Sequence, residues 1–250
     1  MAKDTPGVPI WGLPEPGSRR PRFTREQIAG VALEIADGEG FEAVSMRRIA
    51  LALGGGTMSL YHYVRSKADL LALMDDALMA ETLVPDNELP THWRDALATI
   101  ARRTRAVLVR HPWALFSLRE AQFGPHAMRH FEQSLAALAG TGLDAAGTFD
   151  LLALLDDYVF GNVVRTGESR QRAAAAEADP EAVSAAIEFG LGQLQTGQFP
   201  HMEALLGGAD PRVHPEELPG PPMDEAGLGA QFERGLQAML DGAATRLGLA

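Results

Sequence analysis

Apolar residues recur at every third or fourth position through nearly the whole chain after residue 23. The first such run contains Ile28, Val31 and Ile35, and Thr24 and Gln27 precede it at the spacing of a capping box. Further helical runs cover roughly 91–110, 112–122, 125–139, 145–167, 180–197 and 224–246. No stretch alternates convincingly as a strand would, so the sequence predicts an all-α fold.

The bulk composition favours an ordinary folded protein. Of the 250 residues, 46% are apolar, which is enough to fill a core. There is no run of membrane-spanning length and no secretion signal at the start, so we expect a cytoplasmic location with no membrane partner. Cysteine is absent, which excludes disulfides, thiolate metal sites and cysteine nucleophiles.

Charge is distributed unevenly along the chain, whose formal net charge is -11. Residues 1–67 carry nine Lys/Arg and seven Asp/Glu, so all of the excess acidity lies beyond residue 67. Residues 43–67 contain four basic side chains, Arg47, Arg48, Arg65 and Lys67, and no acid. This stretch is the part of the chain that suits a polyanion.

Two segments are predicted to lack helices. The first 21 residues are rich in proline and glycine without an apolar period, so we expect a disordered arm. It leads into Arg19, Arg20 and Arg22, which can either reach a phosphate backbone or simply keep the arm solvated. The second segment, 207–227, is predicted to be a loop.

Short helices are predicted between residues 45 and 66. Ser45 can cap a second helix, the glycines of 54–56 must end it, and a third helix begins at Thr57, each helix having about eight residues. Ser66 and Asp69 then open a longer helix that ends before Pro85. Two short helices joined by a tight glycine turn have the layout of a helix-turn-helix.

The third helix has the chemistry of a DNA-reading surface. Leu60 and Val64 are four residues apart and can pack inward. The residues expected on the remaining surface are Thr57, Met58, Ser59, Tyr61, His62 and Tyr63. Lys67 can hold a phosphate, and Arg47 can reach a guanine edge or a phosphate. The alternative is that the rings are buried and the arginines form a solvated face.

These residues also carry a family resemblance. Residues 24–82, with SMRRIALALGGGTMSLYHYVRSKADLL at their centre, resemble the DNA-binding domain of tetracycline-repressor (TetR) family regulators. The resemblance implies base contacts from Arg47, Thr57, Met58 and Ser59, phosphate contacts mostly from Tyr61, Tyr63 and Lys67, and either role for His62. Gly55 departs from the small apolar residue usual in the family, which implies a missing packing anchor for helix three.

The C-terminal part is similar to the C-terminal domain of the same family, through RHPW at 110–113, YVFGNVV at 158–164 and FERGLQAMLDG at 232–242. The implied organisation is an arm at 1–21, a three-helix DNA-binding domain at 22–68 and a helical ligand-binding and dimerisation domain at 69–250. Helices 145–167 and 224–246 would form the interface of a homodimer. Their apolar faces include Leu151, Leu155 and Val159, and an intrachain core is the alternative use of these residues.

The resemblance further implies a repressor that binds a palindromic double-stranded operator and is released by a small apolar effector, without a cofactor. The implied pocket residues are Ile100, Thr104, Ser117, Glu120, Ser134, Tyr158 and Asn162. Tetracycline repressor holds the magnesium of its drug with a histidine near the position of Ser117, so we do not expect a magnesium-tetracycline complex here.

Two other classes of function compete with this interpretation. A helical enzyme or metal-binding protein would use His126 and His130, which are four residues apart on one helix. No adjoining acid completes a known motif, so no catalytic or metal residue is predicted. A helical scaffold without a DNA partner is the third class, and it would fail to bind duplex DNA.

Overall fold

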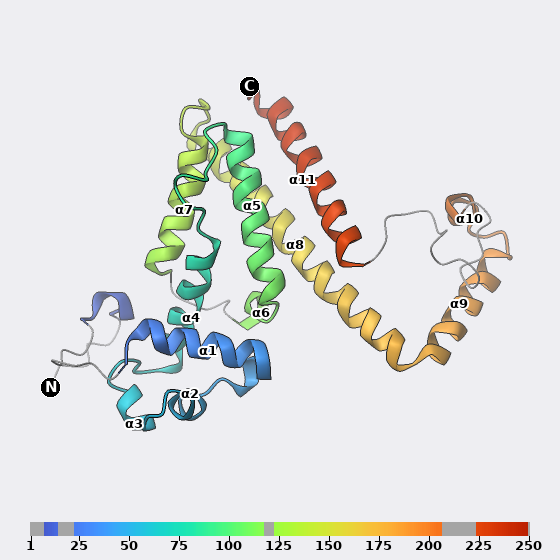
Figure 1. Ribbon diagram of the computed structural model, residues 1–250. Coiled ribbons are helices and arrows are strands. Elements are labelled where there is room, and N and C mark those ends of the chain that lie inside the picture. Colours follow the sequence, from blue (N-terminus) through green and yellow to red (C-terminus); the bar gives the residue numbers. More distant parts are fainter. Residues whose placement is uncertain (1–7, 15–22, 118–122, 207–223, 250) are drawn as a thin grey trace. The chain divides into compact units, whose positions relative to one another are not determined.

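The computed structural model describes residues 8–14, 23–117, 123–206 and 224–249 (Figure 1). Within these ranges all regular structure is helical, which confirms the predicted all-α fold. The α-helices are α1 Arg25–Glu39, α2 Met46–Ala52, α3 Thr57–Leu60, α4 Lys67–Thr82, α5 Trp93–Arg110, α6 Ala114–Ser117, α7 Pro125–Leu138, α8 Ala145–Ala178, α9 Pro180–Leu194, α10 Pro200–Leu206 and α11 Glu225–Leu247. Two short 3-10 turns, η1 Ile10–Gly12 and η2 Phe41–Ala43, flank α1.

The chain forms two compact units. The first contains residues 1–160 and 243–250, and the second contains residues 161–242. The long helix α8 therefore begins in the first unit and ends in the second. No helix in the described ranges is long and apolar enough to cross a membrane.

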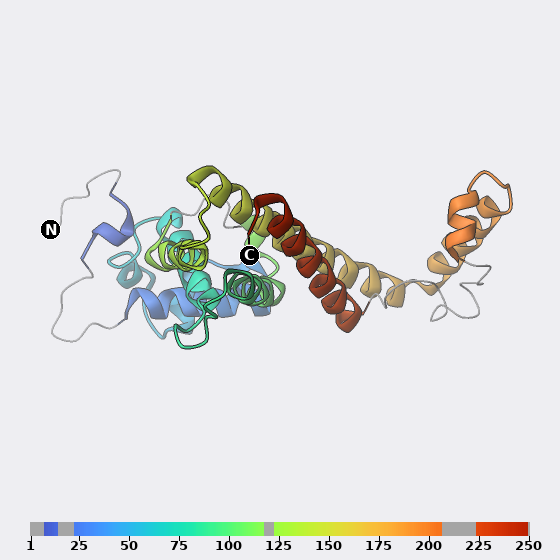
Figure 2. The ribbon, with the colours of Figure 1, turned by 90° about the horizontal axis from the view of Figure 1, so that it is seen from above.

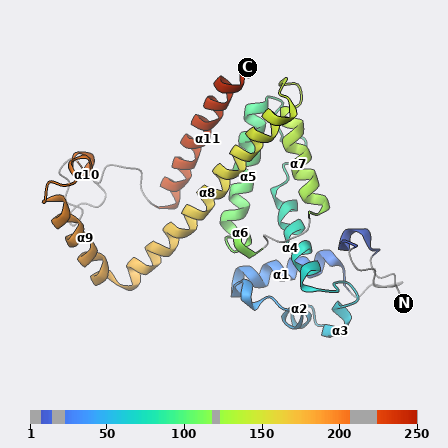
Figure 3. The same ribbon diagram turned by 180° about the vertical axis from the view of Figure 1, so that it is seen from behind.

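Helices α1 to α4 form one end of the first unit (Figure 3). Thr24 caps α1 with the predicted capping box, because its hydroxyl accepts from the Gln27 amide (3.1 Å) while the Gln27 side chain accepts from the Thr24 amide (3.0 Å). The apolar side of α1, including Ile28 and Ile35, is buried against α4 and its surroundings. This packing fixes α4 relative to α1.

Helix α4 continues from that end into a layer with α5 and α7 (Figure 2). The same helix contacts α1, α5 and α7, so it belongs to both halves of the first unit. Buried apolar residues on its inner side include Leu73, Met74 and Leu78. A shift of α4 would therefore be felt at both ends of this unit.

The second unit contains the C-terminal part of α8, then α9, α10 and most of α11. Arg170 of α8 forms an ion pair with Glu225 of α11 (2.8 Å). Helices α9 and α10 pack on each other and carry exposed apolar side chains, among them Phe189 and Leu205.

Several predicted boundaries need correction. Helix α3 has four residues rather than about eight, since residues 61–63 form turns after Leu60. Residues 8–14 of the predicted disordered arm are ordered and packed. Helix α10 lies in a stretch without a predicted helix. Residues 207–223 of the predicted loop lie outside the described residues, and its last three belong to α11.

The apolar faces that were assigned to a dimer interface are used inside the chain. Leu151, Leu155 and Val159 of α8 are buried in the single chain, and so are Phe232 and Leu236 of α11. The intrachain core is therefore the correct interpretation for these residues. Different α8 side chains remain exposed.

Candidate functional site

A glycine turn connects α2 to α3. Ser45 caps α2 by accepting a hydrogen bond from the Arg48 amide (3.2 Å). Gly54 has φ of +65°, in the left-handed region that favours glycine. The Gly55 amide then donates to the Ala50 carbonyl (2.8 Å) and closes the turn. The chain thereby places α3 directly after α2, as a helix-turn-helix requires.

The ring of Phe23 fills the space beside Gly55. A Cβ at position 55 would stand 3.0 Å from Cε2 of Phe23 and closer still to Cζ. The ring is buried and meets the Tyr63 ring edge-on, with centroids 6.2 Å apart. An aromatic side chain from outside the helix-turn-helix thus supplies the packing that the family resemblance implied to be missing at Gly55.

Leu60 and Val64 are fully buried, as predicted, although Val64 lies beyond the end of α3. The opposite side is open. Met58 is 76% exposed, and the side chains of Tyr61 and His62 are also exposed. Thr57 and Ser59 are half-buried on the same short helix.

A groove of about 540 Å³ runs between α2, α3 and the start of α4. Four of the predicted DNA-contacting residues line it: Arg47, Thr57, Tyr61 and Lys67. Met58 and Ser59 on α3, and His62 in the turn after α3, do not line the groove. The structure therefore brings together, around one groove, residues from three consecutive helices.

Tyr63 is not on the predicted surface. It is only 8% exposed, and its ring packs edge-on against Phe23. The reason is that α3 ends at Leu60, so the following turn carries Tyr63 inward beside Val64. Tyr63 contributes to the core of this end of the molecule, and its expected place among the exposed rings is wrong.

Two of the four basic side chains in this stretch are already engaged. Arg48 forms an ion pair with a glutamate at the end of α1 (Nε to Oε2, 3.1 Å). Arg65 pairs with Asp69 (Nε to Oδ2, 3.1 Å). Arg47 and Lys67 have no hydrogen bond or ion pair with any described residue. The cations that remain for a polyanion are thus the two that line the groove.

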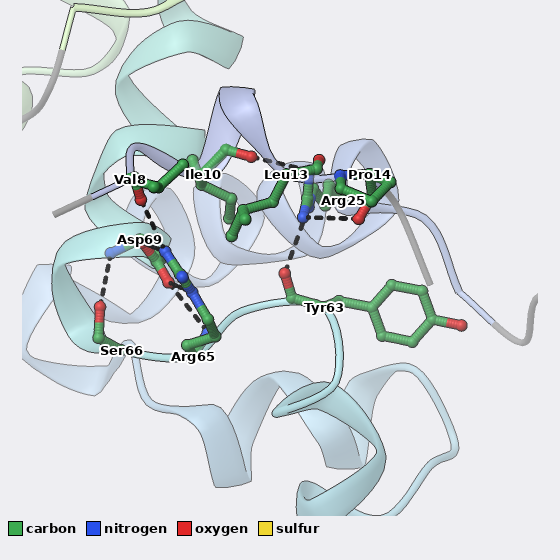
Figure 4. Close-up of polar contacts among 9 residues, drawn as sticks. All are labelled: Val8, Ile10, Leu13, Pro14, Arg25, Tyr63, Arg65, Ser66 and Asp69. Atoms are coloured by element: carbon green, nitrogen blue, oxygen red, sulfur yellow. Dashed lines mark hydrogen bonds and ion pairs between the residues drawn. The ribbon is translucent and has the colours of Figure 1, made fainter. Parts of the chain in front are cut away.

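Residues 8–14, here called the N-terminal segment, are held by Arg25 at the start of α1 (Figure 4). Its guanidinium donates to the carbonyls of Ile10 (3.0 Å) and Leu13 (2.8 Å), and its Nε donates to the carbonyl of Tyr63 (3.3 Å). The Ile10 side chain is fully buried. One arginine therefore ties the N-terminal segment to the turn that follows α3.

A second arginine ties the N-terminal segment to α4. Arg65 donates to the Val8 carbonyl (3.1 Å) while its carboxylate partner Asp69 accepts the Arg65 amide (3.1 Å), as Figure 4 shows. Ser66 caps α4 by accepting from the Asp69 amide (3.1 Å). In a standard capping box the Asp69 carboxylate would accept a hydrogen bond from the Ser66 amide. Here it accepts from the Arg65 amide instead. Lys67 follows directly on this fixed loop.

A small cavity of about 40 Å³ lies inside the first unit, between α5, α7 and α8. Its lining residues are Ile100, Ala101, Thr104, His130, Phe131, Ser134, Leu152, Leu155, Asp156 and Val159. Most of the wall is apolar. The volume accommodates about one water molecule, far below the roughly 300–1,000 Å³ of occupied ligand sites.

The predicted pocket residues fall into three groups. Those that line the cavity are Ile100, Thr104 and Ser134. Tyr158 and Asn162 lie on α8 but not in the cavity wall. Ser117 lies in α6, but its side chain is not among those described, and Glu120 falls outside the described residues. The sequence missed His130 as a pocket residue, although its spacing of four from Ser134 on one helix contains that signal.

The polar groups of the cavity differ in their hydrogen bonds and in their pKa values. Thr104 is 6% exposed, and its buried hydroxyl has no hydrogen-bond partner among the described residues. His130 Nδ1 lies 3.1 Å from the Thr82 hydroxyl, which itself donates to the Met79 carbonyl (2.8 Å). Burial lowers the pKa of His130 and therefore favours its neutral form. At the rim of the cavity, desolvation by the surrounding side chains, reinforced by the charge of the neighbouring aspartate, raises the pKa of Asp156 to about 6.

Ion pairs join α1 and α4 to the helices that surround the cavity. The buried carboxylate of Asp76 on α4 accepts from the His126 amide and pairs with His126 Nδ1, both at 2.7 Å. Asp37 at the end of α1 pairs with His111 Nδ1 (2.7 Å) and accepts from Trp113 Nε1 (2.8 Å). These contacts connect the helix-turn-helix end mechanically to α5 and α7.

The same contacts bear on the two histidines considered as metal ligands. His126 is bound by Asp76 and His130 by Thr82, so each uses Nδ1 in a structural hydrogen bond. In the part of the chain that the structure describes, no three His, Asp or Glu residues are grouped as a metal site would require.

Comparison with known proteins agrees with this geometry. The family model described as "Bacterial regulatory proteins, tetR family" matches residues 28–74, which contain the helix-turn-helix. The model "Tetracyclin repressor-like, C-terminal domain" matches residues 85–247, which contain the cavity. The chain is 33% identical over 244 residues to the HTH-type transcriptional repressor DrrR1 of Streptomyces coeruleorubidus, covering 93% of this chain and 82% of that protein.

Solved structures give the same result. The TetR family protein ActR of Streptomyces coelicolor, in complex with (S)-DNPA, superimposes with a TM-score of 0.64 at 26% identity, covering 90% of this chain and 98% of that one. Its complex with actinorhodin gives a TM-score of 0.63 at 25% identity, covering 91% and 97%. The chain is a transcriptional regulator rather than an enzyme, and it belongs to the tetracycline-repressor (TetR) family.

Proposed function

We propose that this regulator binds a near-palindromic operator as a homodimer, represses transcription there, and is released by a small apolar effector. The observation that carries the proposal is the groove in which Arg47 and Lys67 lack partners among the described residues while Arg48 and Arg65 are neutralised. The net charge of the chain is -11, yet two cations lie beside an exposed short helix. This surface is therefore the place where the chain can bind a polyanion.

The groove suggests a division of roles on DNA. Arg47 and Thr57 are proposed to read base edges in the major groove, with Met58 and Ser59 beside them on α3. Lys67 and Tyr61 are proposed to hold phosphates, and His62 can serve either role. Tyr63 is left with a packing role because it is buried.

Exposed apolar side chains support the homodimer. Phe149, Leu154 and Phe160 on α8 are 58%, 47% and 42% exposed in the single chain. Phe149 and Phe160 are eleven residues apart, which is about three helical turns, so they lie on the same side of α8. Large apolar groups exposed on one side of a helix indicate a surface that another molecule covers. A two-fold dimer through α8 would present two recognition helices about 34–36 Å apart, which is one turn of DNA, and hence a palindromic operator.

The cavity between α5, α7 and α8 is the proposed effector site. Its walls are mostly apolar, and three residues implied by the family resemblance, Ile100, Thr104 and Ser134, lie in them. The related protein ActR is known in complex with actinorhodin and with (S)-DNPA. An effector much larger than about 40 Å³ must push these helices apart.

Release would follow from that expansion. Helix α4 contacts α1, α5 and α7, and Asp76 clamps it to the start of α7. An effector that favours a displaced α4 therefore disfavours the helix spacing that the operator needs, and the two ligands oppose each other with equal coupling energies. Such a repressor acts where the chromosome lies, which in a bacterium is the cytoplasm.

The test is a selection of bound sequences from a random duplex pool, using the purified full chain at about 150 mM salt to suppress nonspecific attraction. We expect one palindromic motif, bound with roughly nanomolar affinity. A pool without a motif would contradict sequence-specific binding, and a single half-site bound by a monomer would contradict the dimer.

A further inference from the structure

The hydrogen-bond network of His130 determines which of its nitrogens carries the proton. The Thr82 hydroxyl donates its single proton to the Met79 carbonyl (2.8 Å), so toward His130 Nδ1 (3.1 Å) the hydroxyl oxygen can only accept. In this arrangement His130 Nδ1 carries the hydrogen. Because burial lowers the pKa of His130, the ring is neutral and Nε2 is left as an acceptor.

The other polar groups around the cavity are also mostly acceptors. His130 Nε2 has no hydrogen-bond partner among the described residues. The Ser134 hydroxyl gives its proton to the His130 carbonyl (3.1 Å), which leaves only its lone pairs. Asp156 adds a carboxyl group at the rim, and only the buried Thr104 hydroxyl can donate freely. A ligand that pairs with these acceptors must bring a donor of its own.

The apolar walls indicate the rest of the ligand. Phe131 lines the cavity and stacks on Phe149 with ring centroids 6.0 Å apart, and Leu155 and Val159 face the same space. A flat ring fits between such walls better than a flexible chain, because aromatic pairs gain additional stabilisation from stacking. Thr82, the partner of His130, is the last residue of α4 and is fully buried.

We propose that the cavity binds an aromatic effector through a hydroxyl group that donates a hydrogen bond to His130 Nε2, and that Thr82 relays this bond to the last turn of α4. This inference rests on the proposed effector site and adds its ligand chemistry and its coupling residue. Thr104 provides the second hydrogen bond, since its hydroxyl can accept or donate.

The tautomer can be tested without any ligand. Side-chain ¹⁵N NMR of the full chain, with His130→Phe used to assign the signals, should show His130 protonated at Nδ1. Thr82→Val should abolish that state and Thr82→Ser should keep it, because only serine retains the accepting hydroxyl. A wild-type His130 protonated at Nε2 would overturn the proposal.

Ligand chemistry is tested with two matched probes, 2-naphthol and 2-methoxynaphthalene, in the second of which a methyl group replaces the hydroxyl proton. By calorimetry the wild-type protein should bind 2-naphthol at least about fivefold more tightly, as expected for one buried neutral hydrogen bond. His130→Phe should equalise the two probes, whereas His201→Phe, at an exposed position on α10, should leave the preference unchanged. Equal binding to the wild-type protein, or no binding of either probe, would overturn the inference.

Operator binding distinguishes this inference from the proposed function. Saturating 2-naphthol should weaken binding to the selected operator at least about threefold in the wild type, and less in Thr82→Val. Unchanged operator affinity in the wild type would refute the relay through Thr82. A protein that selects an operator but shows no probe preference keeps the proposed function and loses the inference. A protein that prefers 2-naphthol but selects no operator keeps the inferred ligand chemistry and loses the proposed function.

Discussion

Gly55→Ala provides a sharp test of the packing in the helix-turn-helix. The added methyl would stand 3.0 Å from Phe23 Cε2 and closer still to Cζ, whereas carbon atoms pack best about 3.5–4.0 Å apart. The ring cannot simply move into solvent because it is only 4% exposed. Overpacking of this kind in a core costs about 1–3 kcal/mol.

The assay is a double-mutant cycle in urea with Phe23→Ala. That substitution alone should cost about 3–5 kcal/mol because it leaves a cavity beside Gly55. In its background the methyl added at position 55 meets no ring and partly fills the space, so the second change should be neutral or stabilising. The coupling energy between the two sites should therefore be at least about 1 kcal/mol.

Gly56→Ala is the matched control. A Cβ there meets only the Ser59 hydroxyl at 4.0 Å, and the backbone φ of −91° is ordinary for alanine. It should change stability by no more than about 1 kcal/mol. If Gly55→Ala cost the same with and without the Phe23 ring, this ring would not be the group that replaces a packing anchor.

Three further predictions concern the interface and the charges. Lys67→Ala should weaken binding to every duplex and lower the salt slope of the affinity by about one, whereas Arg47→Ala should relax base preference. Gel shifts on operator and random DNA measure both effects, and equal losses of affinity on the two DNAs would refute both roles. Burial, with a smaller contribution from the adjacent Asp76, raises the pKa of Asp75 from 3.8 to about 6. The folded state therefore binds this proton more tightly than the unfolded state does, and the free energy of unfolding falls as pH rises from about 4 to 6. Asp75→Asn should consequently stabilise the protein by about 1–2 kcal/mol at pH 7 and progressively less toward pH 4, which urea unfolding at both pH values would check. Ile10→Asp should detach the N-terminal segment and weaken operator binding, with Ile10→Val as the control, and a variant with wild-type affinity and unchanged proteolysis near residue 14 would contradict it.

Local signals made much of the fold predictable. The capping box of Thr24 and Gln27 lies within four residues, so its chemistry is visible in the sequence and the structure confirms it. The inward packing of Leu60 follows from helical spacing in the same way, whereas Val64 lies beyond the end of α3 and is held there by a hydrogen bond from its amide to the Leu60 carbonyl (2.9 Å). Ile100, Thr104 and Ser134 could be grouped from the sequence because they lie on regular helices whose register the resemblance fixed, and they share one cavity wall.

Contacts between distant segments were not predictable. The N-terminal segment has no apolar period, and it is ordered by Arg25 and Arg65, which lie as many as 57 residues further along the chain. Tyr63 was misplaced because a helix of four residues is too short for its periodicity to extend into the next turn. His130 stood out only as a possible metal ligand, since its partner Thr82 is 48 residues away.

The small size of the cavity also has a consequence for rates. A space of about 40 Å³ cannot admit an aromatic molecule, so entry has to wait for α5, α7 and α8 to separate. The observed association rate should therefore rise with effector concentration only until it equals the rate of opening, and then stay constant. Such a regulator would respond to its effector with a delay that the protein sets, and a higher dose would not shorten it.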